Sequence, residues 1–223
     1  RAGLGGTDMG ARGIEPAPVN VDPAATPNLL WANDAPVVMD GQTVTNRQLA
    51  TAGGAQNALY AVIAFTPAAT QPKSSGNIFQ LRSSVGETML SLTYRSDLQT
   101  VIMENSLSGG NHASNSIPGS AVAGETPLIM EMWLDGTSGT LRGLSKPSTT
   151  TLTPSINSAT NIRFGTPDWG GEVLSGTIHA LAVYDRMPAA SERLALRAWA
   201  HERAGVPFTE RAVPPLPAPL PAG

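Results

Sequence analysis

Most of the chain consists of short apolar runs separated by turn residues, a pattern that is typical of β-strands. In residues 89–95 (MLSLTYR), large apolar side chains alternate with polar ones, so one face of that strand is apolar and the other polar. Residues 58–65 are apolar throughout, which indicates a strand with both faces buried. The same criteria predict strands at 58–65, 77–82, 89–95, 99–104, 128–134, 141–144, 161–165 and 177–184, and a polar loop at 105–116.

One helix is predicted, after the last strand. Pro188 suits its first turn, and Ser191 is an alternative N-cap. Gly205 is a natural residue to end the helix, and Pro207 prevents its continuation. We expect a buried stripe of Leu194, Ala198 and Trp199 and a solvent-facing side of Arg193, Arg197, Glu202 and Arg203.

Frequent short strands and one terminal helix predict an all-β fold. The expected architecture is a two-sheet antiparallel jelly-roll sandwich with one C-terminal α-helix and extended terminal arms. Asp135-Gly136, directly after the strand at 128–134, is the strongest hairpin signal in the chain. Trp31, Trp133 and Trp199 are expected in the core or at docking surfaces.

Composition divides the chain into three parts. Residues 1–27 carry five Gly and four Pro without a period and are expected to form an extended arm. Residues 28–206 hold the apolar pattern of the sandwich, and residues 207–223 carry six Pro, as in a polyproline segment. Neither end can bury a core of its own. We therefore expect both ends to contact neighbouring subunits of a homo-oligomer, or else to act as flexible linkers in a longer protein of which this chain, beginning at Arg1, is a fragment or processed product.

Charge and cysteine content narrow the functional classes. Charged residues make up 14% of the chain and the net charge is −3, whereas nucleic-acid binding requires a basic surface. The chain has no Cys, so disulfides and thiolate metal sites do not contribute to the fold. No apolar run reaches the length of about 18 residues that a membrane-spanning helix needs.

Three segments carry a resemblance to a known family. They are residues 174–206 (LSGTIHALAVYDRMPAASERLALRAWAHERAGV), 133–143 (WLDGTSGTLRG) and 162–171 (IRFGTPDWGG). Together they resemble laminin-G-like jelly-roll domains of the concanavalin A-like lectin/glucanase superfamily, of the kind found in phage structural and bacterial surface proteins. The resemblance covers about residues 55–206 and implies a protein that binds or builds rather than catalyses.

Catalytic patterns are missing from the sequence. Glucanases of this superfamily use acids spaced E-x-D-x-E on one strand, whereas Glu131 has no acidic partner two residues away and is expected to be exposed. The three histidines lie in a predicted loop (His112), a strand (His179) and the helix (His201), and no G-x-S-x-G elbow occurs. We expect no enzyme activity, with glycoside hydrolysis as a remote alternative.

The candidate ligand-binding residues are Trp169 with Asp168, and Asn111 with His112. An exposed Trp beside loop amides would suit a glycan, but the favoured interpretation is that Trp169 is an apolar plug beneath its own loop. The resemblance also allows calcium at Asp168, with Glu172 close by, although no Asp-rich ligand loop surrounds them. No cofactor is otherwise expected.

Two main functions follow. In the first, the chain is a structural protein that displays a jelly roll on a large assembly such as a phage-like virion, as a head decoration, spike or tail-associated subunit. In the second, it is a glycan-binding adhesion or host-recognition module. Both place the protein on a virion or at the cell surface or outside the cell, with a cell-surface glycan as an additional partner.

Overall fold

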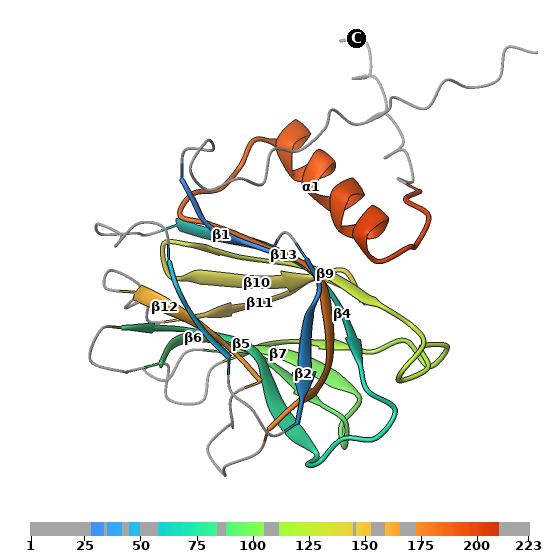
Figure 1. Ribbon diagram of the computed structural model, residues 1–223. Coiled ribbons are helices and arrows are strands. Elements are labelled where there is room, and N and C mark those ends of the chain that lie inside the picture. The colour runs from blue at the N-terminus through green and yellow to red at the C-terminus, as the bar shows by residue number, and fades with distance from the viewer. Residues whose placement is uncertain are drawn as a thin grey trace, which may run out of the picture.

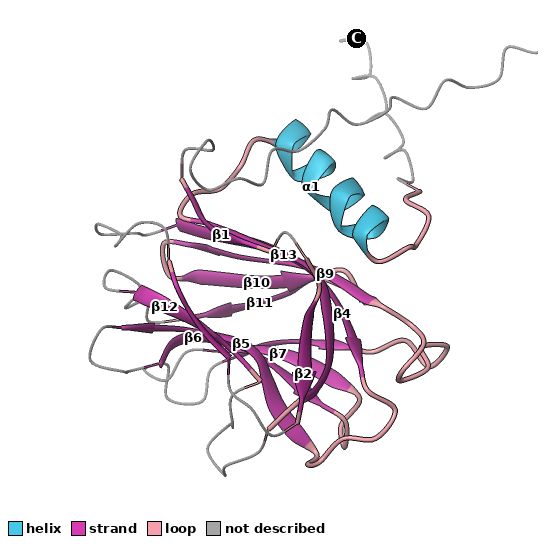
Figure 2. Cartoon of the chain, in the orientation of Figure 1, coloured by secondary structure: helices cyan, strands magenta, loops and turns pink. Residues whose placement is uncertain are grey.

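The computed structural model describes residues 28–33, 35–41, 45–49, 58–83, 88–104, 112–144, 146–152, 159–165 and 173–209. These residues form thirteen strands and one helix. The strands make two antiparallel sheets that are stacked face to face, and the helix lies on the outer face of one sheet (Figure 1). Figure 2 shows the same arrangement by element type, with strands in both layers and a single helix at one side. The predicted all-β sandwich with one C-terminal helix is confirmed.

Sheet A has seven strands in the order β1, β13, β4, β9, β10 and β11, and β2 also pairs with β13. Its strands are β1 (Leu29–Ala32), β2 (Val37–Asp40), β4 (Ala58–Pro67), β9 (Leu128–Asp135), β10 (Ser138–Arg142), β11 (Ser148–Thr151) and β13 (Ser175–Tyr184). Sheet B has six strands in the order β3, β12, β5, β6, β7 and β8. They are β3 (Thr45–Gln48), β5 (Ser75–Ser83), β6 (Thr88–Arg95), β7 (Thr100–Glu104), β8 (His112–Ser116) and β12 (Ala159–Phe164).

The main core lies between the sheets, and a second apolar cluster lies between sheet A and the helix. Strand β4 contributes to both. Leu59, Ile63 and Phe65 face the main core, whereas Tyr60 and Val62 face the helix. All five are fully buried, which explains why the 58–65 segment is apolar at every position.

Strand β8 corrects the prediction of a polar loop at 105–116 in its last five residues, whereas residues 105–111 lie outside the described part of the chain. The inward positions of the strand are Ala113 and Asn115, both fully buried. The Asn115 amide donates to the carbonyls of Leu141 (3.0 Å) and Lys146 (3.2 Å), so a polar side chain fills a core position with its hydrogen bonds satisfied. A strand with one small apolar residue has no period-two signal, and the sequence therefore did not reveal it. The short strands β1, β2, β3 and β11 were also not predicted.

The predicted Asp135-Gly136 hairpin is confirmed. Asp135 pairs with Ser138 in the register of β9 and β10, which leaves a two-residue turn. Gly136 adopts a φ of +58°, a conformation that favours glycine in tight hairpin turns.

Helix α1 (Ala190–Arg203) is confirmed, but its predicted buried stripe is wrong in part. The buried residues are Leu196 and Ala200, and Trp199 packs against the same cluster while remaining partly exposed. Leu194 and Ala198 are only partly buried. The helix docks through Leu196 and Ala200, four residues apart on one face, because the small Ala180 and Ala182 in the same apolar cluster permit close approach.

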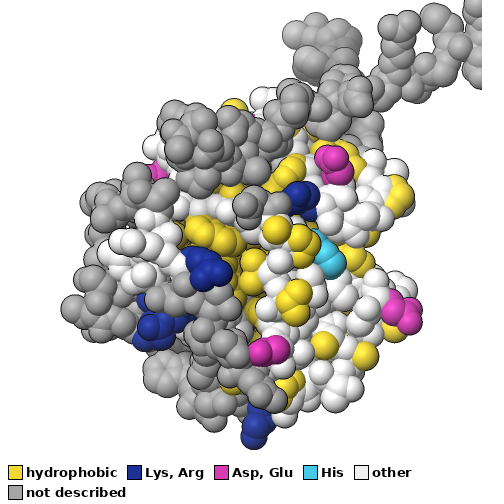
Figure 3. All heavy atoms as spheres, in the orientation of Figure 1, with side chains coloured by type: hydrophobic (Ala, Val, Ile, Leu, Met, Phe, Trp, Pro, Cys, Tyr) yellow, Lys and Arg dark blue, Asp and Glu magenta, His cyan; other side chains and the backbone are white. Residues whose placement is uncertain are grey.

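The surface is sparsely charged, as the composition suggests. On the face seen in Figure 3, charged side chains are scattered among apolar and uncharged polar ones. Within the part of the chain that the structure describes, no helix has the length and apolarity needed to cross a bilayer.

Candidate ligand-binding face

The outer face of sheet B is polar along five neighbouring strands. In β12, β5, β6, β7 and β8, large apolar side chains alternate inward to the main core, so the residues between them face outward. The outward residues are Asn161 and Arg163 on β12, Gln80 and Arg82 on β5, Ser91, Thr93 and Arg95 on β6, Thr100, Ile102 and Glu104 on β7, and His112, Ser114 and Ser116 on β8. We call this set the polar face.

The centre of the polar face is a buried hydrogen-bonded group. Asn77 and Thr93 are opposite each other in the β5–β6 register and are almost completely buried. The Thr93 hydroxyl lies 2.8 Å from Asn77 Oδ1 and 3.2 Å from Glu104 Oε1. Because a hydroxyl has one proton, it donates to one of these acceptors at a time. The group therefore ties β5, β6 and β7 together on their outer side.

Polar atoms beside this group have no partner. Gln80 lies between Arg163 on β12 and Ser91 on β6, and Arg82 is the next outward residue on β5. Gln80 Oε1, Arg82 Nε and Arg163 Nε are buried and make no hydrogen bond within the part of the chain that the structure describes. Burial, followed by the nearby positive charge of Arg163, lowers the pKa of Arg82. Since unpaired buried polar atoms cost free energy, this part of the face is suited to a ligand that offers both donors and acceptors.

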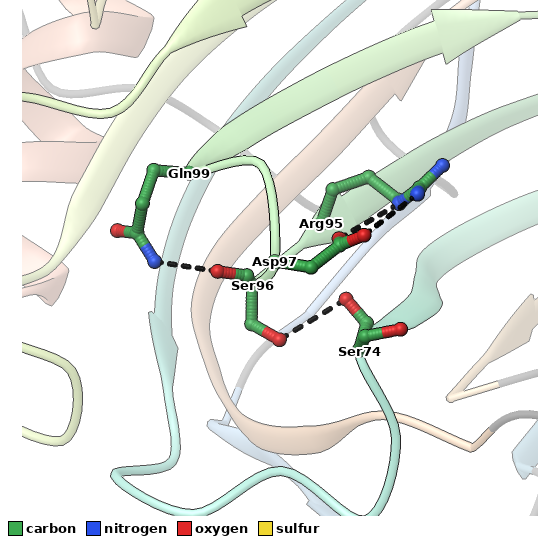
Figure 4. Close-up of polar contacts among 5 residues, drawn as sticks. All are labelled: Ser74, Arg95, Ser96, Asp97 and Gln99. Atoms are coloured by element: carbon green, nitrogen blue, oxygen red, sulfur yellow. Dashed lines mark hydrogen bonds and ion pairs between the residues drawn. The ribbon is translucent and has the colours of Figure 1, made fainter.

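The Arg95 end of the polar face is already engaged within the protein. In the β6–β7 turn, Arg95 Nε and Nη2 donate to the two carboxylate oxygens of Asp97 at 3.1 and 2.9 Å (Figure 4). This bond lowers the pKa of Asp97. Ser96 Oγ donates to the Ser74 carbonyl and Gln99 Nε2 to the Ser96 carbonyl, which closes the turn. The unpartnered polar atoms of the face therefore lie around Gln80, Arg82 and Arg163.

The structure places one of the four residues predicted to bind a ligand. His112 begins β8 and is exposed at the edge of the polar face, in a strand and not in a loop as expected. Asn111, Asp168 and Trp169 lie outside the described residues, as does Glu172. Among the described side chains, no group of three or more His, Asp or Glu residues gathers that could hold a metal ion. The sequence did not single out Gln80, Arg82 or Arg163 as site residues, because each is an ordinary polar position in a strand of alternating apolar and polar residues.

Glu131 corrects a second prediction. It is 3% exposed, beneath α1 on the outer face of β9, and not on a solvent-facing strand position. The Tyr60 hydroxyl donates to its Oε1 (2.6 Å), and Arg142 and Arg197 approach its Oε2 at 3.2 and 3.8 Å. Burial, followed by the Glu131 charge, raises the pKa of Tyr60 far above its ordinary value. Arg197, expected on the solvent side, thus points to a buried carboxylate because α1 docks over it.

Comparison with known proteins gives similarity at the level of structure. No protein-family model matches the chain, and no curated protein sequence matches it. The chain is similar to domains LG4-5 of the mouse laminin alpha1 chain, at 10% identity and a TM-score of 0.49, over 71% of this chain and 47% of the laminin fragment. It is also similar to Trypanosoma rangeli sialidase, at 13% identity and a TM-score of 0.46, over 65% of this chain and 23% of the sialidase. A third similar structure is Caenorhabditis elegans galectin LEC-6, at 16% identity and a TM-score of 0.40, over 65% of this chain and 94% of the galectin.

These similarities concern the fold. The chain spans under half of the laminin fragment and about a quarter of the sialidase, and identities of this size transfer neither ligand nor activity. The order and antiparallel pairing of the two sheets carry the fold assignment.

Proposed function

We propose that this chain is a non-enzymatic glycan-binding module that binds saccharide on the polar face of sheet B. The observation that carries the proposal is the set of unpartnered buried atoms of Gln80, Arg82 and Arg163 on an outer sheet face. A sugar hydroxyl both donates and accepts, so it can satisfy the Gln80 carbonyl oxygen and the guanidinium N–H groups together. Specific binding sites depend on a few such polar groups placed to fix the ligand's orientation.

The mixture of groups favours a hydroxyl-rich ligand over a polyanion. Beside the two guanidiniums, the polar face carries uncharged Gln, Ser and Thr groups and the Glu104 carboxylate. The net charge of the chain is −3, so no large basic field attracts a nucleic acid. The described outward positions of sheet B carry no Trp, Tyr or Phe, and a stacking platform for the sugar ring would have to come from the segment that contains Trp169.

Absence of catalysis is part of the proposal. Glycoside hydrolysis by the usual route needs two carboxyl groups that flank the scissile bond. Among the described strand positions of the polar face, Glu104 supplies one carboxylate, and it contacts the Thr93 hydroxyl. Glu131 lies on the outer face of sheet A and is surrounded by cationic partners.

A glycan array with the full chain tests this function. We expect binding to at least one glycan, with no release of reducing ends during incubation. Arg163→Gln removes one guanidinium and is expected to weaken binding about tenfold, the effect of losing one charge-assisted hydrogen bond. Arg193→Gln on α1 is the matched control and is expected to bind uncharged glycans as the wild type does. Lack of binding to any glycan, or equal binding by Arg163→Gln, contradicts the proposed site.

The alternative site at Trp169 is tested in the same assay. Loss of binding in Trp169→Ala with unchanged binding in Arg163→Gln would move the site from the polar face to the segment that contains Trp169. Release of reducing ends would contradict the non-enzymatic role and favour the remote alternative of a glycoside hydrolase.

A second proposed role is display on a large assembly such as a phage-like virion, which also places the protein on a virion or cell surface. Its support is the Pro- and Gly-rich composition of residues 1–27 and 207–223. These segments, apart from residues 207–209, lie outside the described residues. Light scattering of the full chain tests the homo-oligomer that this role implies, and a monomer at all concentrations contradicts it.

A further inference from the structure

A pocket of about 300 Å³ lies between the first half of α1 and the outer face of sheet A, on β9 and β10. It is on the opposite sheet from the polar face and is independent of the proposed glycan site. Its lining combines basic side chains with the first turn of the helix, and consists of Glu131, Arg142, Ala190, Ser191, Arg193, Leu194 and Arg197.

The pocket contains more positive than negative charge. Three guanidiniums line it, against the single carboxylate of Glu131. Arg142 and Arg197 both approach Oε2 of that carboxylate, and the Tyr60 hydroxyl donates to Oε1. Within the lining, three guanidiniums thus share the single carboxylate of Glu131.

Glu192, the acidic residue in the first turn of α1, is engaged by Arg186 and not by the guanidiniums of the pocket. Glu192, in the first turn of α1, accepts two hydrogen bonds from Arg186 at 2.7 and 2.9 Å. Arg193 Nε is buried and has no hydrogen-bond partner. The N-cap residue Ala189 provides no side-chain acceptor for the first helical N–H groups. Donors from two sources, the guanidiniums and the helix start, therefore lie at the same pocket.

Solvent reaches this pocket from the helix side. The Glu131 side chain is 4% exposed and forms the floor, whereas the Arg142 side chain is 37% exposed. Ser191 is exposed at the start of α1. The lining is therefore most open to solvent at Ser191 and Arg142.

We propose that this pocket binds the oxyanion of a small acidic ligand, a carboxylate, sulfate or phosphate group carried on a molecule about as large as a monosaccharide. The planar fork of a guanidinium donates two parallel hydrogen bonds to such a group, which chloride and neutral ligands cannot accept in the same way. The size limit follows from the volume, which is at the low end of the range for small-molecule pockets.

Thermal unfolding and calorimetric titration of the full chain test the proposal with four probes at matched ionic strength: sulfate, inorganic phosphate, glucuronate and uncharged glucose. We expect at least one of the three anions to raise the melting temperature and to give a saturable titration. Glucose is expected to do neither at this pocket. Stabilisation by glucuronate alone identifies a carboxylate ligand, and stabilisation by the inorganic anions identifies a sulfate or phosphate group.

Two variants locate the effect. Arg193→Gln leaves both ion pairs of Glu131 in place and is expected to weaken anion binding tenfold or more. Ser191→Glu places a carboxylate at the pocket mouth and in the first helical turn, where a negative charge favours the helix. It is expected to fold at least as stably as the wild type and to lose the response to anions.

Arg163→Gln on the polar face is the control that separates the two sites, since it is expected to weaken glycan binding about tenfold and to keep the anion response. Arg47→Gln, on β3 of sheet B, removes one positive charge as Arg193→Gln does. It is expected to keep the anion response. The proposal is overturned if none of the three anions stabilises the protein, or if Arg193→Gln and Ser191→Glu respond as the wild type does.

Discussion

At the scale of single residues, Glu131 shows how the protein holds a charge in its interior. Its carboxylate accepts from Tyr60 and pairs with Arg142 and Arg197, and it is 3% exposed. Burial of an unpaired carboxylate is strongly unfavourable, so each partner is needed to retain it. The same arrangement brings the guanidiniums of the anion pocket together.

Replacement of Glu131 by Gln is expected to lower the free energy of unfolding by about 3 kcal/mol, because it leaves Arg142 and Arg197 without their shared counter-ion. Urea denaturation measures this loss. Glu125→Gln, the same change at an exposed position, is the control and is expected to stay within about 0.5 kcal/mol of the wild type. A loss at Glu131 no larger than at Glu125 contradicts this account.

His179 makes stability depend on pH. Burial lowers its pKa, and its Nε2 lies 2.8 Å from Thr66 Oγ1. The unfolded chain, with an ordinary pKa of about 6.5, therefore binds a proton more readily than the folded protein. Stability is expected to be complete well above pH 6.5, the ordinary value, and to fall as the pH drops below it.

His179→Gln should reduce this slope, measured by urea unfolding across the same pH range. Some slope remains, because burial also lowers the pKa of His201. Thr66→Val removes the hydrogen-bond partner and no titrating group, so it should lower stability and leave a dependence on pH in place. The account fails if His179→Gln leaves the slope as it was.

At the scale of elements, the β9–β10 pair of sheet A depends on a glycine that lies close to the neighbouring backbone. Gly143, directly after β10, has a φ of +128°. A Cβ atom there would lie 2.5 Å from the Ile129 carbonyl oxygen and 2.9 Å from Met130 Cα, both backbone atoms of β9. The pairing of β10 with β9 therefore requires glycine at this position.

Gly143→Ala is expected to destabilise the protein by about 2–3 kcal/mol, from backbone strain and from the contact with β9. Gly119→Ala is the matched substitution, because a Cβ at Gly119 has open space. It should be neutral or stabilise by up to about 1 kcal/mol through the unfolded chain. Equal denaturation midpoints for the two variants would refute the role given to Gly143.

At the scale of the whole molecule, the described residues contain two apolar clusters that share sheet A. One is enclosed by the two sheets and the other by sheet A and α1. Since each is enclosed by residues between 28 and 209, this part of the chain holds the groups that a stable fold needs.

A fragment of residues 28–209 is therefore expected to unfold at the same urea concentration as the full chain. Under the assembly proposal, the fragment is monomeric in light scattering while the full chain associates. A fragment that is less stable than the full chain would show that residues outside this range contribute to the fold.

The sequence by itself determined the class of fold, most of the central strands, the hairpin at Asp135-Gly136 and the position of the single helix. These features follow from local patterns: period-two alternation, turn dipeptides and helix-terminating residues. The apolar pattern at 58–65 also predicted that both faces of this strand are buried.

Only the tertiary structure decided which outward positions matter. Glu131 and Arg197 are ordinary residues of a strand and a helix until α1 docks on sheet A through Leu196 and Ala200. Gln80, Arg82 and Arg163 become neighbours through pairing between β5 and β12, which lie about 80 residues apart in the sequence. A period of two says which face a side chain occupies, but the partner strand and the covering helix determine what that side chain contacts.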